Sequence, residues 1–201
     1  QEFLEPMSIE MNSYEREAYD IVLGKIWAAS ESNYDQDFDL IMKLRRGRMM
    51  RLRQCISYTR LLSTAIENYD ENLLDGTSLE SIVNDYDRLE IPAKLDTLMN
   101  LLDRLISEGQ KVVIWTNFIE TLKLIDRTIT NTGPTTRMIY GGTPLEKTTI
   151  EDEYTRGQAI REFNDPSSGV DILIANPAAC SESISLHKYC SNAIYYDLSY
   201  N

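Results

Sequence analysis

Short, continuously apolar runs rich in β-branched residues alternate with helical patterns in the second half of this 201-residue chain. A strand that is apolar at nearly every position is typical of a sheet buried on both faces. Strand, helix, strand, helix, strand, connection and strand is the order of a parallel α/β sheet flanked by helices. The expected strands are Lys111–Thr116, Arg137–Tyr140, Val170–Ala175 and Ala193–Asp197.

Capping residues indicate where the helices of this half begin and end. An apolar stripe over Leu95–Ile106 is followed by Gly109, which predicts a helix with a glycine stop. We expect further helices over Asn117–Ile129 and Thr143–Phe163, each with its first residue as the N-cap. Thr143 is followed by proline, the favoured first residue of a helix.

The first half of the chain is expected to be helical. Apolar residues recur at helical spacing over Ser13–Trp27, and a second helical region is expected over about Phe38–Ile66, broken near Gly47. Glu67–Glu90 holds eight acidic residues and one basic residue, and we interpret it as a solvated loop or insertion. The expected domains are a helical segment, residues 1–91, with an acidic insertion at about 67–90, and an α/β lobe, residues 92–201.

Composition limits the class of protein. Apolar residues make up 42% of the chain, enough for a real core, and no run approaches the roughly 20 apolar residues of a membrane span. A signal peptide is not evident, and three scattered cysteines do not make a disulfide framework. We therefore expect a cytoplasmic protein with no membrane partner. The chain starts with Gln1 and stops at Asn201 just after an apolar run, so we expect a piece of a longer protein.

Charge argues against indiscriminate binding to nucleic acid, but the charge is unevenly distributed. The formal net charge is −12, from 20 basic and 32 acidic residues, and phosphate contacts need clustered Lys and Arg. A basic cluster lies apart from the acidic stretch. On a helix it could follow a phosphate backbone, or its arginines could pair with the surplus carboxylates, and both interpretations stay open. Its members are Lys43, Arg45, Arg46, Arg48, Arg51 and Arg53.

The carboxyl ends of parallel strands are where such sheets bind ligands. Thr116–Asn117, Gly141–Thr143 and the segment from Asn176 onward each follow an expected strand, so we expect them to form one functional edge. At a helix N-terminus, unpaired N–H groups and roughly half a positive charge favour phosphate, and glycines let it approach closely. Gly141-Gly142-Thr143 therefore suits a phosphate, and a simple tight turn explains the same residues equally well.

The sequence lacks complete nucleotide sites and the common catalytic arrangements. It has no G-x-x-x-x-G-K-[ST] and no G-x-G-x-x-G motif. Ser-His or Cys-His catalysis would have to use His187, the single histidine. Cys180, His187 and Cys190 have no second closely spaced pair, so we expect them to be structural or exposed rather than zinc ligands. Glu182 could be catalytic, but one carboxylate without a partner does not indicate a particular reaction. We expect no metal site and no catalytic residue.

Five segments, in order, resemble the second RecA-like lobe of superfamily two helicases, and most closely that of the Swi/Snf-type DNA translocases. The helical half also resembles the segments that lead into that lobe. The resemblance covers most of the chain, and the acidic stretch least. It implies an α/β fold with a RecA-like parallel sheet flanked by helices and preceded by a helical segment. The five segments are Lys111–Leu122, Tyr140–Thr143, Ile160–Asn164, Asp171–His187 and Ala193–Asn201.

The resemblance implies roles for the residues of the strand-end loops. The first loop matches motif IV, which lies along the tracked strand; the second matches the loop that grips backbone phosphate; the third matches motif V, which links DNA contacts to the nucleotide site. The implied DNA contacts are Thr116, Asn117, Gly141, Gly142, Thr143 and Asn176, to which we add Arg45, Arg48 and Arg51 of the basic cluster. The implied nucleotide contacts are Glu182, Ser183 and Ser185.

The chain departs from the family pattern at several positions. Motif V has Pro177, Cys180-Ser181 and Ser183 where the family has Thr and glycines, and Tyr58-Thr59 replaces a common His-Pro. Motif VI would begin after the last residue, and the first lobe is not in the sequence. The resemblance therefore implies the second motor lobe of an ATP-dependent DNA helicase or translocase, inactive by itself. ATP and Mg²⁺ are expected in the intact parent, and none is expected on this chain.

The implied partners are one strand of a DNA duplex and the N-terminal RecA-like lobe of the same parent chain. Two other classes stay open. One is an interaction module that keeps the fold but has lost contact with DNA. The other is a nucleotide-sugar enzyme on a similar sheet, which would need a nucleotide-binding acidic residue after a strand end, and none stands out.

Overall fold

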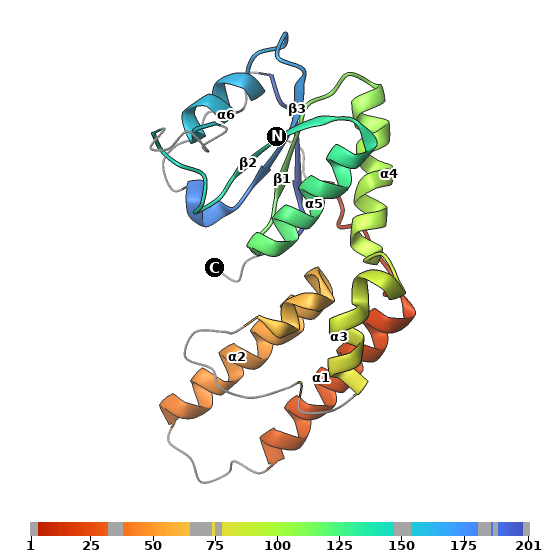
Figure 1. Ribbon diagram of the computed structural model, residues 1–201. Helices are drawn as coiled ribbons and strands as arrows, with labels where there is room; N and C mark the ends of the chain where they lie inside the picture. The colour runs from red at the N-terminus through yellow and green to blue at the C-terminus, as the bar shows by residue number, and fades with distance from the viewer. Residues whose placement is uncertain are drawn as a thin grey trace. The chain divides into compact units, whose positions relative to one another are not determined.

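The computed structural model describes residues 4–31, 38–64, 74, 78–146, 154–180, 186 and 189–198 of the chain. Contacts divide the chain into two compact units, Gln1–Asp96 and Thr97–Asn201 (Figure 1). No helix in these described ranges is long and apolar enough to cross a membrane.

The first unit is built from helices, as expected. Helix α1 (Ser13–Glu31) packs against α2 (Phe38–Ser57) and α3 (Ser78–Leu89), and the 3-10 helix η1 (Thr59–Ser63) packs against α2 and α3. The expected break near Gly47 is wrong, because α2 continues through this buried glycine. Packing of α2 on its neighbours outweighs the roughly 1 kcal/mol that a glycine costs inside a helix.

Helix α3 corrects the interpretation of the acidic stretch as a solvated loop over residues 78–89, whereas residues 67–73 and 75–77 lie outside the described part of the chain. Four side chains of this helix, Leu79, Ile82, Val83 and Tyr86, are buried. Their spacing of three and four residues places them on one face of a helix. The acidic residues between them lie on the opposite, solvated face of the helix. Helix α3 is therefore amphipathic, although the high charge of the stretch suggested a loop.

Two glutamates tie the start of α1 to the connection between α3 and α4 (Ala93–Ser107). The Glu90 carboxylate accepts hydrogen bonds from the N–H groups of Tyr14 (3.2 Å) and Glu15 (2.7 Å) in the first turn of α1. The buried Glu15 carboxylate accepts from the N–H groups of Asn12 (2.9 Å) and Ala93 (3.1 Å). Each carboxylate therefore satisfies N–H groups that a helix start leaves unpaired.

The second unit contains a parallel sheet in the order β2-β3-β1-β4. Its strands are β1 (Val112–Trp115), β2 (Thr135–Ile139), β3 (Val170–Ala175) and β4 (Asn192–Tyr195). The four strands lie where the sequence predicts them: β3 has the predicted ends, and the ends of the other three are shifted by one or two residues. The two central strands, β1 and β3, are the most apolar ones, as their burial on both faces requires.

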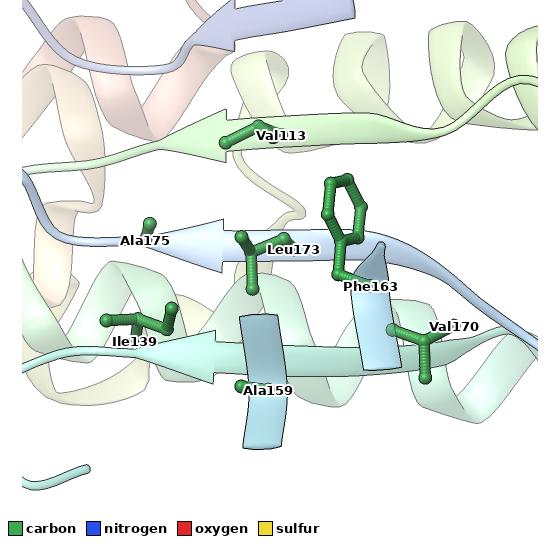
Figure 2. Close-up of a cluster of buried hydrophobic side chains, with 7 residues drawn as sticks. All are labelled: Val113, Ile139, Ala159, Phe163, Val170, Leu173 and Ala175. Carbon is green, nitrogen blue, oxygen red and sulfur yellow. The ribbon is translucent and has the colours of Figure 1, made fainter. Parts of the chain in front are cut away.

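Helices cover both faces of this sheet (Figure 1). On one face, Ala159 and Phe163 of α6 (Arg156–Phe163) pack against Val113, Leu173 and neighbouring strand residues (Figure 2). On the other face, Ile172 lines a small apolar pocket of about 280 Å³ together with residues of α4 and of α5 (Ile119–Thr132). Adjacent residues of β3 therefore point to opposite helices, as strand geometry dictates.

Helix ends follow the sequence in one case and depart from it in another. The predicted stop after α4 is confirmed, because Gly109 has a φ of 72°, a conformation that favours glycine. The expected helix start at Thr143 is wrong, because residues 144–146 are not helical. Helix α6 begins at Arg156, where Thr155 and Gln158 form a capping box.

The core between α6 and the sheet predicts the effect of a truncation. Phe163→Ala removes a fully buried ring, and we expect it to lower the free energy of unfolding by about 3–5 kcal/mol. Urea unfolding followed by Trp115 fluorescence, in a Trp27→Phe background, measures this unit alone. Leu145→Ala, at an exposed position, is the control. Equal urea midpoints for the two variants would contradict this packing.

The helical unit predicts an unreactive thiol. Cys55 is buried, and burial, with a smaller contribution from Glu15, raises the pKa of its thiol to about 12. A raised pKa leaves only about one thiol in ten thousand ionised at pH 8, so we expect Cys55 to react with a disulfide reagent only after unfolding in urea. The Cys55→Ser variant should lack this slow class of thiol. Fast labelling of all three cysteines in the folded chain would refute the prediction.

Candidate nucleic-acid interface

The strands of the sheet end side by side at its carboxyl edge. In the register, Trp115 pairs with Ala175 on one side and with Tyr195 on the other, and Ile139 also pairs with Ala175. The loops after the strands therefore begin at the same level. The loops expected at this edge do meet there, and they consist of residues 116–118, 140–143, 176–180 and 196–198.

Thr116 joins the loop after β1 to the loop after β4. Its side chain is fully buried and donates a hydrogen bond to the carboxylate of Asp197 (2.6 Å). The side-chain amide of Asn117 donates to the main-chain carbonyl of Asp197 (3.2 Å). Thr116 is therefore held inside the edge, and its hydroxyl is engaged within the protein.

The expected N-cap at Asn117 is wrong. Helix α5 begins at Ile119, and Phe118 occupies the N-cap position without a side-chain cap. The Asn117 amide is drawn to Asp197, while the Thr116 hydroxyl accepts a long hydrogen bond from the Phe118 N–H (3.4 Å). Glu120 lies three residues after Asn117, where it could complete a capping box, but it accepts from the Lys123 ammonium (2.8 Å).

Asn176 bridges the loops after β1 and β2. Its main-chain N–H donates to the carbonyl of Ile139 (2.8 Å), and its side-chain amide donates to the carbonyl of Asn117 (2.9 Å). Its side-chain oxygen accepts from Ala178 N–H (3.0 Å), which starts the short 3-10 helix η2 (Pro177–Cys180). All these bonds are internal, so Asn176 organises the edge.

The Gly141-Gly142-Thr143 loop is a tight turn fastened at its last residue. The Thr143 N–H donates to the carbonyl of Tyr140 (3.0 Å), and the buried Thr143 hydroxyl donates to the carbonyl of Met138 (3.1 Å). The two glycines between are exposed, and their N–H groups make no hydrogen bond to any residue in the described part of the chain. A Cβ on Gly142 would lie 2.6 Å from the Tyr140 ring, so glycine lets that ring rest on the turn.

The basis expected for phosphate binding therefore changes. Residues 144–146 are not helical, so the N–H groups of the turn are not those of a helix N-terminus. What the turn offers is two adjacent, exposed main-chain N–H groups, which are the donors that a phosphate oxygen needs.

Arg156 is a residue of this edge that the sequence analysis missed. Its guanidinium donates from Nε to the carbonyl of Thr143 (2.8 Å), from Nη2 to that of Tyr140 (3.3 Å) and from Nη1 to that of Ala179 (3.1 Å). The expected helix over Thr143–Phe163 places Arg156 in mid-helix, so the sequence did not set it apart. Since α6 begins at Arg156, this basic residue lies in the first turn, where it opposes the helix dipole, and its position calls for another explanation.

The basic cluster of α2 belongs to the other unit, and its arginines differ in burial; Arg53 is half-buried, and the Lys43 side chain lies outside the described part of the chain. Arg45 and Arg46 are exposed, whereas Arg48 and Arg51 are buried. Arg51 donates from Nη1 to the Gln54 side chain (3.0 Å) and to the carbonyls of Leu62 (3.2 Å) and Thr64 (2.6 Å). Arg51 thus holds η1 against α2, a role that competes with the expected contact to DNA.

The three expected nucleotide contacts, Glu182, Ser183 and Ser185, lie outside the described residues.

Comparison with solved structures finds extensive likeness to ATPase domains, whereas neither a protein-family model nor a curated protein sequence matches the chain. The C-terminal part of the Fun30 ATPase domain has a TM-score of 0.59 at 18% identity, over 96% of this chain and 74% of that one. The Sulfolobus solfataricus SWI2/SNF2 ATPase C-terminal domain has a TM-score of 0.61 at 18% identity, over 91% of this chain and 66% of that one. This chain has the fold of a SWI2/SNF2-type C-terminal lobe.

The larger S. solfataricus SWI2/SNF2 ATPase core, solved in complex with dsDNA, gives the same result. Its TM-score is 0.64 at 16% identity, over 94% of this chain. The expected α/β fold with a RecA-like parallel sheet is thereby confirmed. The chain spans 33% of the length of that core and 66% of the length of the C-terminal domain.

The bond between Thr116 and Asp197 predicts what stabilises this edge of the sheet. Thr116→Val removes a donor from a buried carboxylate, and we expect it to lower the free energy of unfolding by about 1–3 kcal/mol. Thr116→Ser keeps the hydroxyl and should cost less. Urea unfolding followed by Trp115 fluorescence compares the two, and a Val variant as stable as the Ser variant would show that the bond contributes nothing.

Proposed function

We propose that this chain is the second motor lobe of an ATP-dependent DNA helicase or translocase and that its sheet edge grips one strand of DNA. The observation that carries the proposal is the pair of exposed N–H groups at Gly141 and Gly142, on a loop fixed at the carboxyl edge of the sheet. Main-chain N–H groups bind phosphate without reading base sequence, as a motor that moves along DNA requires.

The buried polar side chains of the edge support this grip by holding the loops in place. Thr116, Thr143 and Asn176 are buried and bonded within the protein. In the proposed function they position the loops, and Asn117 and the two glycines lie nearest to the strand. Of the arginines expected on DNA, we keep Arg45 as a candidate contact, because its exposure in the structure leaves it accessible.

ATP and Mg²⁺ belong to the proposal for the intact parent, together with an N-terminal RecA-like lobe. The resemblance places Glu182, Ser183 and Ser185 at the nucleotide cleft between the lobes. This chain would supply part of that cleft, and the partner lobe would supply the groups that hold the phosphates and the metal ion. A structural neighbour, the S. solfataricus ATPase core, was solved with dsDNA, which supports DNA as the polymer that the parent would act on.

The grip predicts weak, salt-dependent binding to DNA. We expect short single-stranded and duplex DNA to bind, with log K falling linearly with log salt by about 0.7–0.9 for each phosphate that a basic side chain neutralises. Fluorescence anisotropy at several salt concentrations between 50 and 200 mM, roughly the range over which such contacts weaken, measures the slope. Absence of salt-dependent binding would favour the interaction module.

A matched pair of variants assigns the contact to the turn. Gly141→Ala keeps the N–H group and puts its Cβ into open space, so its affinity should match that of the unchanged chain. Gly141→Pro removes the N–H group, and its affinity should fall several-fold at every salt concentration while the slope stays the same, because the N–H group carries no net charge. Equal affinities for the two variants would exclude this N–H group as a phosphate donor.

The proposal also predicts that residues 1–201 hydrolyse no ATP, because the groups that bind the phosphates and the metal belong to the other lobe. A coupled phosphate-release assay with and without DNA measures this. Turnover above background that rises with DNA would contradict the assignment.

A further inference from the structure

We propose that Arg156 is a positioning residue that holds the phosphate-binding turn in place and couples it to the segment after β3. This inference rests on the proposed function, because it explains how the turn at Gly141-Gly142 is kept ready for DNA. Arg156 stands at the start of α6, yet its guanidinium donates to carbonyls in two other segments.

Each of the two segments is locally rigid without Arg156. The turn after β2 is closed by the bond from Thr143 N–H to the Tyr140 carbonyl and fastened to the strand by the Thr143 hydroxyl. The segment after β3 is closed by the bond from Ala179 N–H to the Asn176 carbonyl and by the Asn176 side chain. Arg156 bonds to both segments at once, in addition to the bond from the Asn176 N–H to the Ile139 carbonyl, so it is placed to pass a displacement from one segment to the other.

The planar fork of arginine suits this position. Nε and Nη2 reach the two ends of the turn, Thr143 and Tyr140, while Nη1 reaches Ala179. A lysine carries the same charge on a single nitrogen and cannot hold three carbonyls in this fixed geometry. The Arg156 N–H also donates to the carbonyl of Pro144 (2.9 Å), which fixes the start of the helix beside the turn.

Arg156 also supplies positive charge to the turn. The Tyr140 carbonyl and the Gly141 N–H belong to the same peptide unit, and the guanidinium bonds to that carbonyl. A cation on the oxygen of a peptide polarises the unit and makes its N–H a stronger donor. The charge therefore reaches the phosphate site through the peptide, in place of the helix N-terminus that the sequence predicted there.

The first experiment measures the coupling without DNA. Residue-resolved amide exchange is compared for the unchanged chain, Arg156→Ala, Arg156→Lys and Arg161→Ala. Arg161 is an exposed arginine on the same helix, so its variant makes the same change in charge. We expect both Arg156 variants to raise exchange at Thr143, Ala178 and Ala179 together, by tenfold or more, and Arg161→Ala to leave these rates unchanged.

Amides of the central strand β3 separate this effect from unfolding. In the Arg156 variants the Leu173 amide should stay as protected as in the unchanged chain. Unchanged exchange at Thr143, or faster exchange at Thr143 without any change at Ala178 and Ala179, would overturn the coupling. Equal loss of protection at Leu173 in both Arg156 variants would also overturn it, since Arg156 would then stabilise the whole lobe.

The second experiment uses DNA binding. A positioning role requires Arg156→Lys to lose affinity as Arg156→Ala does, although the lysine keeps the charge. Rescue by lysine would instead indicate direct contact with phosphate and would overturn the positioning role. If the unchanged chain binds no DNA, the proposed function fails, whereas the exchange experiment still decides whether Arg156 couples the two segments.

Discussion

The register of the parallel sheet is the constraint on which the rest of the lobe depends. The ladder continues one residue beyond three strand ends, where Thr116, Asn176 and Tyr196 donate their N–H groups to the neighbouring strands. These bonds fix the first residue of each loop, and all later contacts of the edge start from them. A slip of one residue would turn every side chain of a strand to the opposite face. It would therefore remove Thr116 from Asp197 and break the core between the sheet and α6 together.

Side chains and main-chain groups have different roles at this edge: the buried side chains bond within the protein, and the glycine main chain is exposed. A polar residue that follows a buried strand must find a partner inside the protein, because an unpaired polar group costs free energy in a low-dielectric interior. Thr116, Thr143 and Asn176 meet this requirement by bonding to neighbouring loops. The glycines, which have no side chain to bury, are left to face outward. The residue types that look most like ligands in a sequence are thus the ones that the fold itself uses.

The sequence predicts the sheet, its order of elements and the edge where the loops meet, because these follow from apolar runs and from the geometry of parallel strands. The sequence does not predict which of two possible capping boxes starts a helix. Thr143 with Glu146 and Thr155 with Gln158 both fit a capping box, and only the second starts a helix. The burial of Arg51 depends likewise on carbonyls that η1 brings to it. Such contacts arise in the folded chain and leave no mark on local spacing.

Net charge and phosphate binding act on different length scales, which reconciles a charge of −12 with a proposed grip on DNA. Excess negative charge over the whole chain opposes the approach of DNA, but salt screens it beyond about 10 Å at 0.1 M. A contact with phosphate depends on the groups within a few ångströms of it. At that distance the turn has two N–H groups, and the Arg156 guanidinium bonds to carbonyls of the same turn. Such a site binds weakly by itself. Weak local contact that a neighbouring segment can shift is what a stepping lobe needs, since a lobe that held DNA tightly in every state could not move along it.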